Sequence, residues 1–131
     1  MEFTLIEQNA VPLIVLSTAR DPVEQINSIL RRAGHPVHCT WIPSLRDLGD
    51  ALAQLNPELI LFVDTGGDDL GGAATVRDQL APSVPLIVVG EDFDESRIAV
   101  AMAHGARDVV SLGAPARLQA VMGRELRSKP H

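Results

Sequence analysis

Cysteine, lysine and long apolar runs are scarce in this sequence of 131 residues. The single cysteine, Cys39, cannot close an intrachain disulfide, and no second thiol is available for a cysteine-rich metal site. No apolar run approaches the ~20 residues of a membrane-spanning helix. The first residues include Glu2 and Glu7, where a signal peptide carries basic residues. We therefore expect no export and no membrane insertion, and we predict a cytoplasmic protein.

The charge balance is acidic, with 17 Asp and Glu against 11 Lys and Arg and a net charge of −6. Nucleic-acid binding needs clustered Lys and Arg, because these side chains release the counterions condensed on phosphates. We therefore expect no nucleic-acid partner. Hydrophobic residues make up 46%, which is enough to fill one core. One domain over residues 1–131, with a core from about 11 to 127, is expected, and the polar tail indicates a domain taken from a longer multidomain protein.

Apolar runs alternate with helical patterns along the chain, which is typical of βα units in a parallel sheet covered on both faces. The runs predict strands over residues 12–16, 36–42, 59–63, 85–89 and 108–111. This pattern predicts an α/β fold with a doubly wound five-stranded parallel sheet of order 2-1-3-4-5, as in flavodoxin-like folds. Ligands of such sheets bind beyond the carboxyl ends of the strands, so chemistry is expected after Leu16, Val63, Val89 and Ser111.

Helix boundaries are predicted from capping residues. Asp21 is expected to cap a helix with Pro22 in its first turn, Ser44 to begin the second helix and Asp94 to cap the fourth. The glycines and acids of residues 64–72 predict a solvated loop, followed by a short helix over residues 73–80. The last helix is predicted over residues 115–127.

Three segments together resemble response-regulator receiver domains, which are CheY-like. They read N-P-E-L-I-L-F-V over residues 56–63, V-P-L-I-V-V over 84–89 and H-G-A-R-D-V-V over 104–110. Receivers typically read P-D-L-I-L-L-D, T-P-V-I-V-L-T and A-G-A-D-D-Y-L at these places. The order and spacing match from about residue 11 to 127. The resemblance implies the sheet predicted above and a role in bacterial two-component signal transduction.

The residues that a receiver uses to accept a phosphoryl group are missing from the matching positions. The resemblance implies an acidic pair after strand one for a divalent cation, a nucleophilic Asp at the end of strand three, a Thr or Ser after strand four and a Lys after strand five. At these positions the chain carries Ser17 and Thr18, Val63, Gly90 and Leu112.

A slip of one residue brings Asp64 to the nucleophile position, but it does not supply the missing carboxylates. Lys129, in the tail, is the only lysine of the chain. Without a divalent cation and a lysine, the charge on a transferring phosphoryl group is not compensated. We therefore predict a pseudo-receiver that is not phosphorylated, is not an enzyme and carries no metal and no cofactor.

A finer resemblance comes from the segments R-A-G-H over residues 32–35 and S-L-R-D-L-G-D-A-L over 44–52. They are similar to the degenerate N-terminal receiver of FimX-like cyclic-di-GMP signalling proteins, which carry PAS, GGDEF and EAL domains. That family implies a role in type IV pilus function and twitching motility. Two alternatives stay open: the pseudo-receiver of a pilus-localisation ATPase of the TadZ or CpaE type, and a small-molecule sensor with a pocket lined by Ser17, Thr18 and Gly90.

Residues 98–103 read I-A-V-A-M-A, and a helix that is apolar nearly all round predicts a second covered face. Receivers commonly pair through their fourth helix, fifth strand and fifth helix. By this resemblance the candidate contact residues are Arg97, Met102, Arg107, Asp108, Arg117 and Arg124. Protein partners are expected, including a second copy in a homodimer. The alternative is that small residues pack this helix tightly against the sheet.

Overall fold

Residues 10–65 and 69–127 are described by a computed structural model in which strands and helices alternate. The strands are β1 (Val11–Leu16), β2 (Val37–Ile42), β3 (Leu59–Val63), β4 (Leu86–Gly90) and β5 (Asp108–Ser111). The helices are α2 (Asp21–Arg32), α3 (Leu48–Leu55), α4 (Asp69–Leu80), α5 (Glu95–Ala103) and α6 (Pro115–Arg127), with a 3₁₀ helix η1 (Leu45–Asp47) before α3. The strands pair in parallel in the order β2-β1-β3-β4-β5, which confirms the predicted doubly wound fold.

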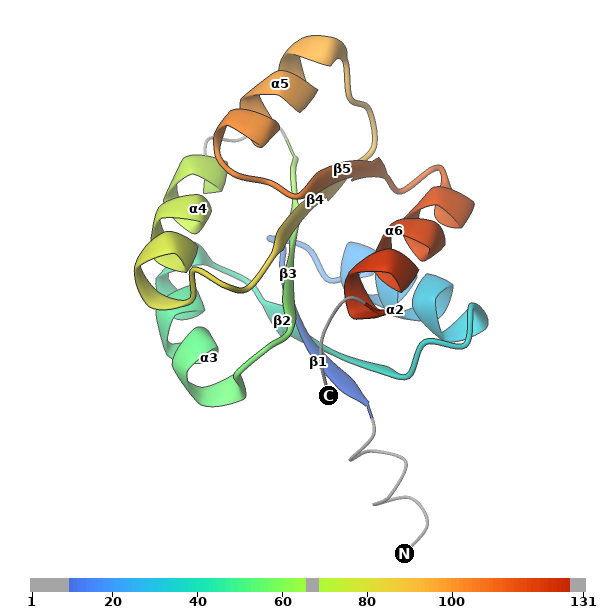
Figure 1. The fold of residues 1–131 in the computed structure, drawn as a ribbon, viewed down its shortest axis with the longest axis horizontal. Coiled ribbons are helices and arrows are strands. Elements are labelled where there is room, and N and C mark those ends of the chain that lie inside the picture. The colour runs from blue at the N-terminus through green and yellow to red at the C-terminus, as the bar shows by residue number, and fades with distance from the viewer. Residues whose placement is uncertain (1–9, 66–68, 128–131) are drawn as a thin grey trace, which may run out of the picture.

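The sheet lies between two helical layers, with α2 and α6 on one face and α3, α4 and α5 on the other (Figure 1). The five residues of β3 are all buried. Leu59, Leu61 and Val63 pack in the core under α2 and α6, whereas Ile60 and Phe62 pack in the core on the opposite face. A continuous apolar run is what a strand covered on both faces requires. β3 therefore lies at the centre of the sheet, as predicted.

Two predicted helix caps are wrong, because neither the Asp21 side chain nor the Ser44 side chain makes a capping hydrogen bond. The residue before α2 is Arg20, and Asp21 is the first helical residue without capping its backbone. Ser44 does not begin an α-helix: its hydroxyl donates to a carboxylate oxygen of Asp47 at 3.0 Å, and η1 precedes α3. Both carboxylates still lie in the first turn of a helix, where they complement the helix dipole.

Helix α4 begins at Asp69, four residues before the predicted start at Ala73. Gly71 and Gly72, read as loop residues, lie inside this helix. A Cβ atom on Gly72 would lie 2.5 Å from Cδ2 of Leu45, so a larger residue there would require the Leu45 side chain to shift. Residues 66–68 of the predicted loop lie outside the described residues.

The predicted cap of the fourth helix is confirmed. The side chain of Asp94 caps α5 by accepting the backbone N–H of Arg97 at 2.8 Å. Gly34 and Gly105 follow the ends of α2 and α5 with φ of +82° and +92°, the left-handed conformation that glycine adopts most easily. In the described ranges, none of the helices combines the length and the apolar character that a membrane span requires.

Candidate functional site

The carboxyl ends of β1, β3, β4 and β5 meet at one edge of the sheet, where the sequence predicted the site. Backbone hydrogen bonds fix the segments that leave these strands. The N–H of Asp64 donates to the carbonyl of Val89 at 2.8 Å, and the N–H of Leu112 donates to the carbonyl of Gly90 at 2.7 Å. The candidate residues after β3, β4 and β5 are therefore neighbours, as a parallel sheet requires.

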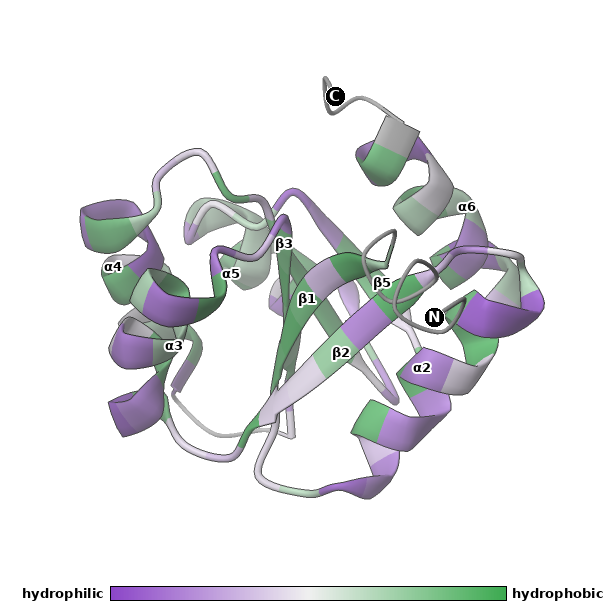
Figure 2. Cartoon of the chain, turned by 90° about the horizontal axis from the view of Figure 1, so that it is seen from below, coloured by the Kyte–Doolittle hydropathy of each residue, from purple (hydrophilic) through white to green (hydrophobic). Residues whose placement is uncertain are grey.

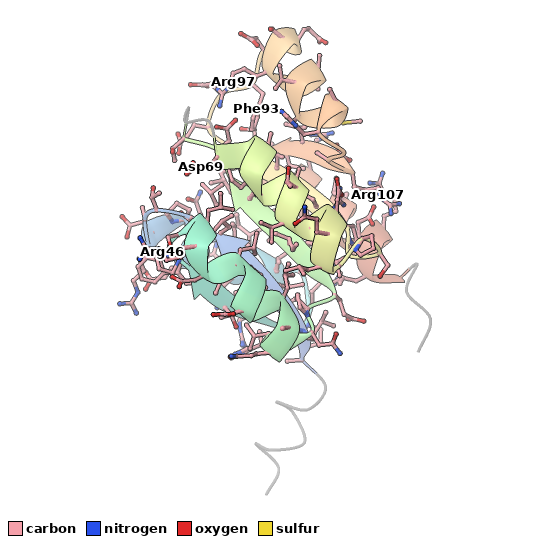
Figure 3. All side chains as sticks on the ribbon, turned by 90° about the vertical axis from the view of Figure 1, so that its left-hand side faces the viewer. Arg46, Asp69, Phe93, Arg97 and Arg107 are labelled. Atoms are coloured by element: carbon pink, nitrogen blue, oxygen red, sulfur yellow. The ribbon has the colours of Figure 1, made fainter. Side chains whose placement is uncertain are left out.

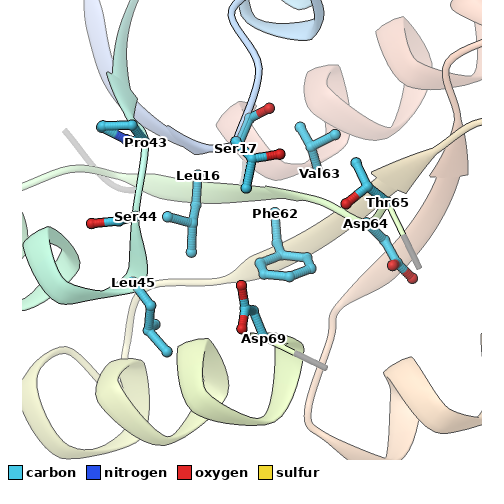
Figure 4. A pocket seen from close by; sticks show the side chains of 11 residues that line it. Leu16, Ser17, Pro43, Ser44, Leu45, Phe62, Val63, Asp64, Thr65 and Asp69 are labelled. Atoms are coloured by element: carbon cyan, nitrogen blue, oxygen red, sulfur yellow. The ribbon is translucent and has the colours of Figure 1, made fainter. Parts of the chain in front are cut away.

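The six candidate residues line two hollows, and not the one pocket that was expected. The first hollow, of about 30 Å³, is lined by Leu16, Ser17, Thr18, Pro43, Ser44, Leu45, Phe62, Val63, Asp64, Thr65 and Asp69 (Figure 4). The second, of about 380 Å³, is lined by Pro22, Val63, Asp64, Thr65, Gly90, Glu91, Asp92, Arg97 and Leu112. Ser17 and Thr18 line the first hollow and Gly90 lines the second, and the two hollows adjoin at Val63, Asp64 and Thr65. The first hollow has room for little more than a water molecule.

Ser17 is engaged in the turn between β1 and α2. Its hydroxyl donates to the carbonyl of Ala19 at 2.7 Å and accepts the N–H of Ala19 at 3.2 Å. Its own carbonyl accepts the indole N–H of Trp41 at 2.8 Å. Ser17 is only 3% exposed, and these hydrogen bonds satisfy its hydroxyl and its carbonyl without solvent. The residue that takes the place of a receiver's first carboxylate therefore serves the structure of the turn.

Asp64 forms an ion pair with Arg97, 3.0 Å from Oδ2 to Nη2, with the carboxylate largely buried. The guanidinium of Arg97 also donates to the carbonyl of Asp92 and lies over the ring of Phe93, 4.9 Å from its centroid. Figure 3 shows Arg97 and Phe93 together near the start of α5. Arg97 thus joins the end of β3 to the loop between β4 and α5. Arg97 was expected at an outer interface, and its inward contact with Asp64 was not predicted.

Apolar, buried residues occupy the positions at which a receiver carries its nucleophilic Asp and its lysine. Val63 is 6% exposed and Leu112 is 3% exposed, and both pack in the core under α2 and α6. Gly90 leaves no room for a side chain, because a Cβ atom there would lie 2.9 Å from Cζ of Phe93 and 3.0 Å from the carbonyl oxygen of Asp64. The Thr or Ser that a receiver carries here does not fit this conformation.

The divalent cation that receivers hold requires several carboxylate oxygens in one place. Two carboxylates, those of Asp64 and Asp69, line the first hollow. Asp69 was not predicted as a site residue, because the sequence pattern indicated a loop at this position. The carboxylate of Asp64 points away from Ser17 (Figure 4) and is paired with Arg97. Within residues 10–65 and 69–127, no group of three or more His, Cys, Asp or Glu side chains could hold a metal ion. The residues present do not fit this cation.

Three of the predicted interface residues form one charged cluster on β5 and α6. Asp108 pairs with Arg117 at 3.0 Å and with Arg124 at 3.3 Å. Hydrogen bonds and charge from Glu125 and Asp108 raise the pKa of Arg124 above its ordinary value. Arg107 is exposed nearby on the segment that enters β5 (Figure 3). Asp108, Arg117 and Arg124 therefore lie together, whereas Arg97 lies at the second hollow, and their role in an interface stays a prediction.

Helix α5 is covered on one side only. Ala101 is buried against the sheet, while Val100 and Met102 are 52% and 51% exposed. The alternative that small residues pack this helix tightly accounts for Ala101 and leaves the other two unexplained. Val100 and Met102 lie two positions apart, on either side of Ala101, so each flank of α5 keeps an apolar side chain half in solvent.

Comparison with known proteins places the fold. No family model matches the sequence, and no curated protein matches it. Solved structures do: a pilus assembly-related protein from Burkholderia pseudomallei has a TM-score of 0.77 at 18% identity, covering 95% of each chain. A CheY-like protein, TadZ, from Pseudomonas aeruginosa has a TM-score of 0.72 at 20% identity, covering 92% of this chain and 97% of its own.

A response regulator from Thermotoga maritima has a TM-score of 0.78 at 15% identity, covering 91% of this chain and 99% of its own. At these identities the likeness concerns the fold. The strand order and the five covering helices are those of the same architecture. The chain therefore has the fold of the CheY-like receiver domains.

Proposed function

We propose that this domain is a receiver that is not phosphorylated and that acts as a protein-interaction module in bacterial signalling connected with pili. The observation that carries the proposal is the ion pair of Asp64 with Arg97, at a sheet edge that presents Ser17 and a buried Leu112 where a receiver presents a carboxylate and a lysine. Transfer of a phosphoryl group depends on cations that compensate the developing charge. At this edge the guanidinium of Arg97 is already paired with the carboxylate of Asp64, the residue directly after β3.

The contacts of Arg97 also support a surface held in one conformation. Its guanidinium meets Asp64, the carbonyl of Asp92 and the ring of Phe93. The loop between β4 and α5 is thereby fixed from within the chain, and α5 begins directly after it. A partner that docks on α5 would meet a surface that needs no bound phosphate to form.

The interaction surface that we assign consists of Val100 and Met102 on α5 with the charged cluster of Asp108, Arg117 and Arg124. These residues lie on β5, at the edge of the sheet, and on the two helices that flank it, and exposed apolar side chains with paired charges suit a protein partner, including a second copy of this chain. Light scattering over a concentration series tests self-association. We expect Met102→Glu to abolish a dimer, and Leu80→Glu, on the exposed end of α4, to leave it unchanged. A strict monomer at high concentration would remove the second copy as partner.

A role connected with pili is supported by the pilus assembly-related protein among the similar structures. Two settings follow from the sequence: a FimX-like cyclic-di-GMP protein active in twitching motility, and a pilus-localisation ATPase. The gene downstream of the codon for His131 separates them. PAS, GGDEF and EAL domains support the first, and a P-loop supports the second.

Binding of Mg²⁺ with beryllofluoride, which mimics a phosphoryl group on Asp, tests the proposal at the site itself. We expect no saturable change in the amide spectrum of residues around Asp64. Saturable shifts there would contradict the proposal.

The second hollow, of about 380 Å³, favours the sensor alternative, because it is large enough for a small molecule and Arg97 lines it. A ligand that binds only the folded state raises the melting temperature, so a thermal-shift screen of nucleotides and metabolites tests this alternative. A hit that Arg97→Ala abolishes would favour a sensor over an interaction module.

A further inference from the structure

A trough runs between helix α2 and strand β2, at the edge of the sheet opposite to β5. Its volume is about 390 Å³, and it is lined by Arg20, Val23, Glu24, Asn27, Arg31, His38, Cys39 and Trp41. Figure 2 shows β2 at the edge facing the viewer, with α2 beside it. This surface is separate from α5, where the proposed interaction surface lies, because β2 and β5 are the two outer strands.

The backbone of β2 offers hydrogen-bonding groups to this trough. The carbonyls of Pro36 and Ile42 accept N–H groups of β1 and its continuation, so the even-numbered residues of β2 face β1. In a strand, the N–H and C=O of successive residues point to opposite sides. The N–H and C=O groups of Val37, Cys39 and Trp41 therefore point away from β1, toward the open edge of the sheet. No strand in the described part of the chain pairs with this outer edge.

The side chains along the trough favour a segment in extended conformation. Arg31 covers the carbonyl of Val37, with Nη2 at 3.3 Å, which leaves the backbone groups of Cys39 and Trp41 as the open stretch. Trp41 is held by its bond to the carbonyl of Ser17 and keeps 38% of its surface exposed. The lining positions from Arg20 to Arg31 span about 16 Å along α2. This length suits about five residues of an extended chain.

The charge of the trough is opposite to that of the molecule. The chain has a net charge of −6, yet the trough contains two arginines and one acid. Arg20 and Glu24 pair with each other at 3.3 Å. Within the described residues, Arg31 donates to neutral oxygens, those of Asn27 and Val37. An acidic segment can therefore meet Arg31, whereas a second copy of this edge would bring its own arginines against these.

We infer that the trough binds an extended, acidic segment of a partner protein, which adds to β2 as a sixth strand. The backbone of the segment pairs with Cys39 and Trp41, an acidic side chain meets Arg31, and an apolar side chain packs on Trp41. Addition of a strand to an open sheet edge is an established way to bind peptides, with affinity from backbone bonds and selectivity from side chains. Neither Asp64 nor α5 takes part.

Titration of the whole chain with a short fluorescein-labelled peptide of alternating Glu and Val tests this inference. We expect saturable anisotropy, with amide shifts centred on Cys39 and Trp41. A peptide of the same sequence with N-methyl groups on alternate residues keeps the side chains and loses the donors, and should bind at least about tenfold more weakly. No binding up to about 1 mM, or equal binding of the N-methylated peptide, would overturn the inference.

Two variants locate the binding. Cys39→Pro removes an outward N–H, and proline is tolerated on an edge strand when its nitrogen faces solvent. Arg31→Glu reverses the charge, with Arg46→Glu, on η1, as the matched control. We expect the first two to weaken binding about tenfold or more and the control to leave it unchanged. Loss of binding with Met102→Glu, or a dimer that Cys39→Pro abolishes, would show another surface or another occupant and would contradict the inference.

Discussion

Arg97, in the first turn of α5, lies with its Nη2 atom 3.0 Å from Oδ2 of Asp64, the residue directly after β3. The pair joins two parts of the chain that are far apart in sequence. The guanidinium of Arg97 is thereby paired with the carboxylate of Asp64, which lies nearest to the position of a receiver's nucleophilic Asp. The same guanidinium holds the loop before α5 through Asp92 and Phe93.

Removal of either partner of this pair should destabilise the fold modestly. We expect Asp64→Asn and Arg97→Gln to lower the free energy of unfolding by about 1 kcal/mol each, since the arginine is partly exposed and the carboxylate largely buried. The double variant should cost less than the sum of the two, by on the order of 0.5 kcal/mol. Urea unfolding of the four proteins measures this coupling. Strict additivity would show that the pair contributes no interaction energy.

Substitution of Gly90 should destabilise more than substitution of another buried or helical glycine. A Cβ atom at position 90 meets Phe93 and a backbone oxygen at about 3 Å, so we expect Gly90→Ala to cost about 1 to 3 kcal/mol. Gly49→Ala is the matched control, because its Cβ atom meets only the end of Leu80, at 3.4 Å, inside a helix. The control should be neutral or gain up to about 1 kcal/mol. Thermal unfolding compares them, and equal effects would contradict the crowding at Gly90.

The thiol of Cys39 should make stability depend on pH in the alkaline range. Burial raises the pKa of Cys39 to about 11, and the nearby Arg31 partly opposes this rise. The unfolded chain loses this proton near pH 9, so the contribution of the partly buried thiol is complete below about pH 9 and is lost as pH rises to about 11. The loss should be on the order of 2 kcal/mol.

Urea unfolding of the natural chain and of Cys39→Ala over this pH range isolates the contribution of the thiol. The chain contains no tyrosine and only one lysine, so few other side chains titrate in the same window. The difference in unfolding free energy between the two proteins should shrink as pH rises. A difference that stays constant would mean that the thiol is open to solvent. Slow reaction of Cys39 with a thiol reagent at pH 8 is expected for the same reason.

Local patterns in the sequence were sufficient for the sheet and for several helix ends. The run Leu59–Val63, the cap at Asp94 and the glycine at 105 each act within a few residues of the chain. The start of helix α4 was predicted four residues too late, because Gly71 and Gly72 have a propensity for loops. In the structure Gly72 lies within α4, against the side chain of Leu45. Tertiary contact decided this boundary, and a single sequence does not contain that contact.

The candidate site was predicted in composition but not in arrangement. The positions of the receiver residues could be located because each follows an apolar strand, and Ser17 and Leu112 lie where they were expected. The pairing of Asp64 with Arg97 and the division into two hollows depend on how the loops fold back. No spacing rule connects residues on different βα units. Asp69 was missed for the same reason that α4 was misplaced.

Treatment with acetyl phosphate and Mg²⁺, followed by intact mass measurement, tests the central claim most directly. A receiver with an intact acidic pair and lysine serves as the positive control. We expect the mass of this chain to stay unchanged under conditions that fully modify the control. A species heavier by one phosphoryl group in the natural chain, and absent from Asp64→Asn, would contradict the account.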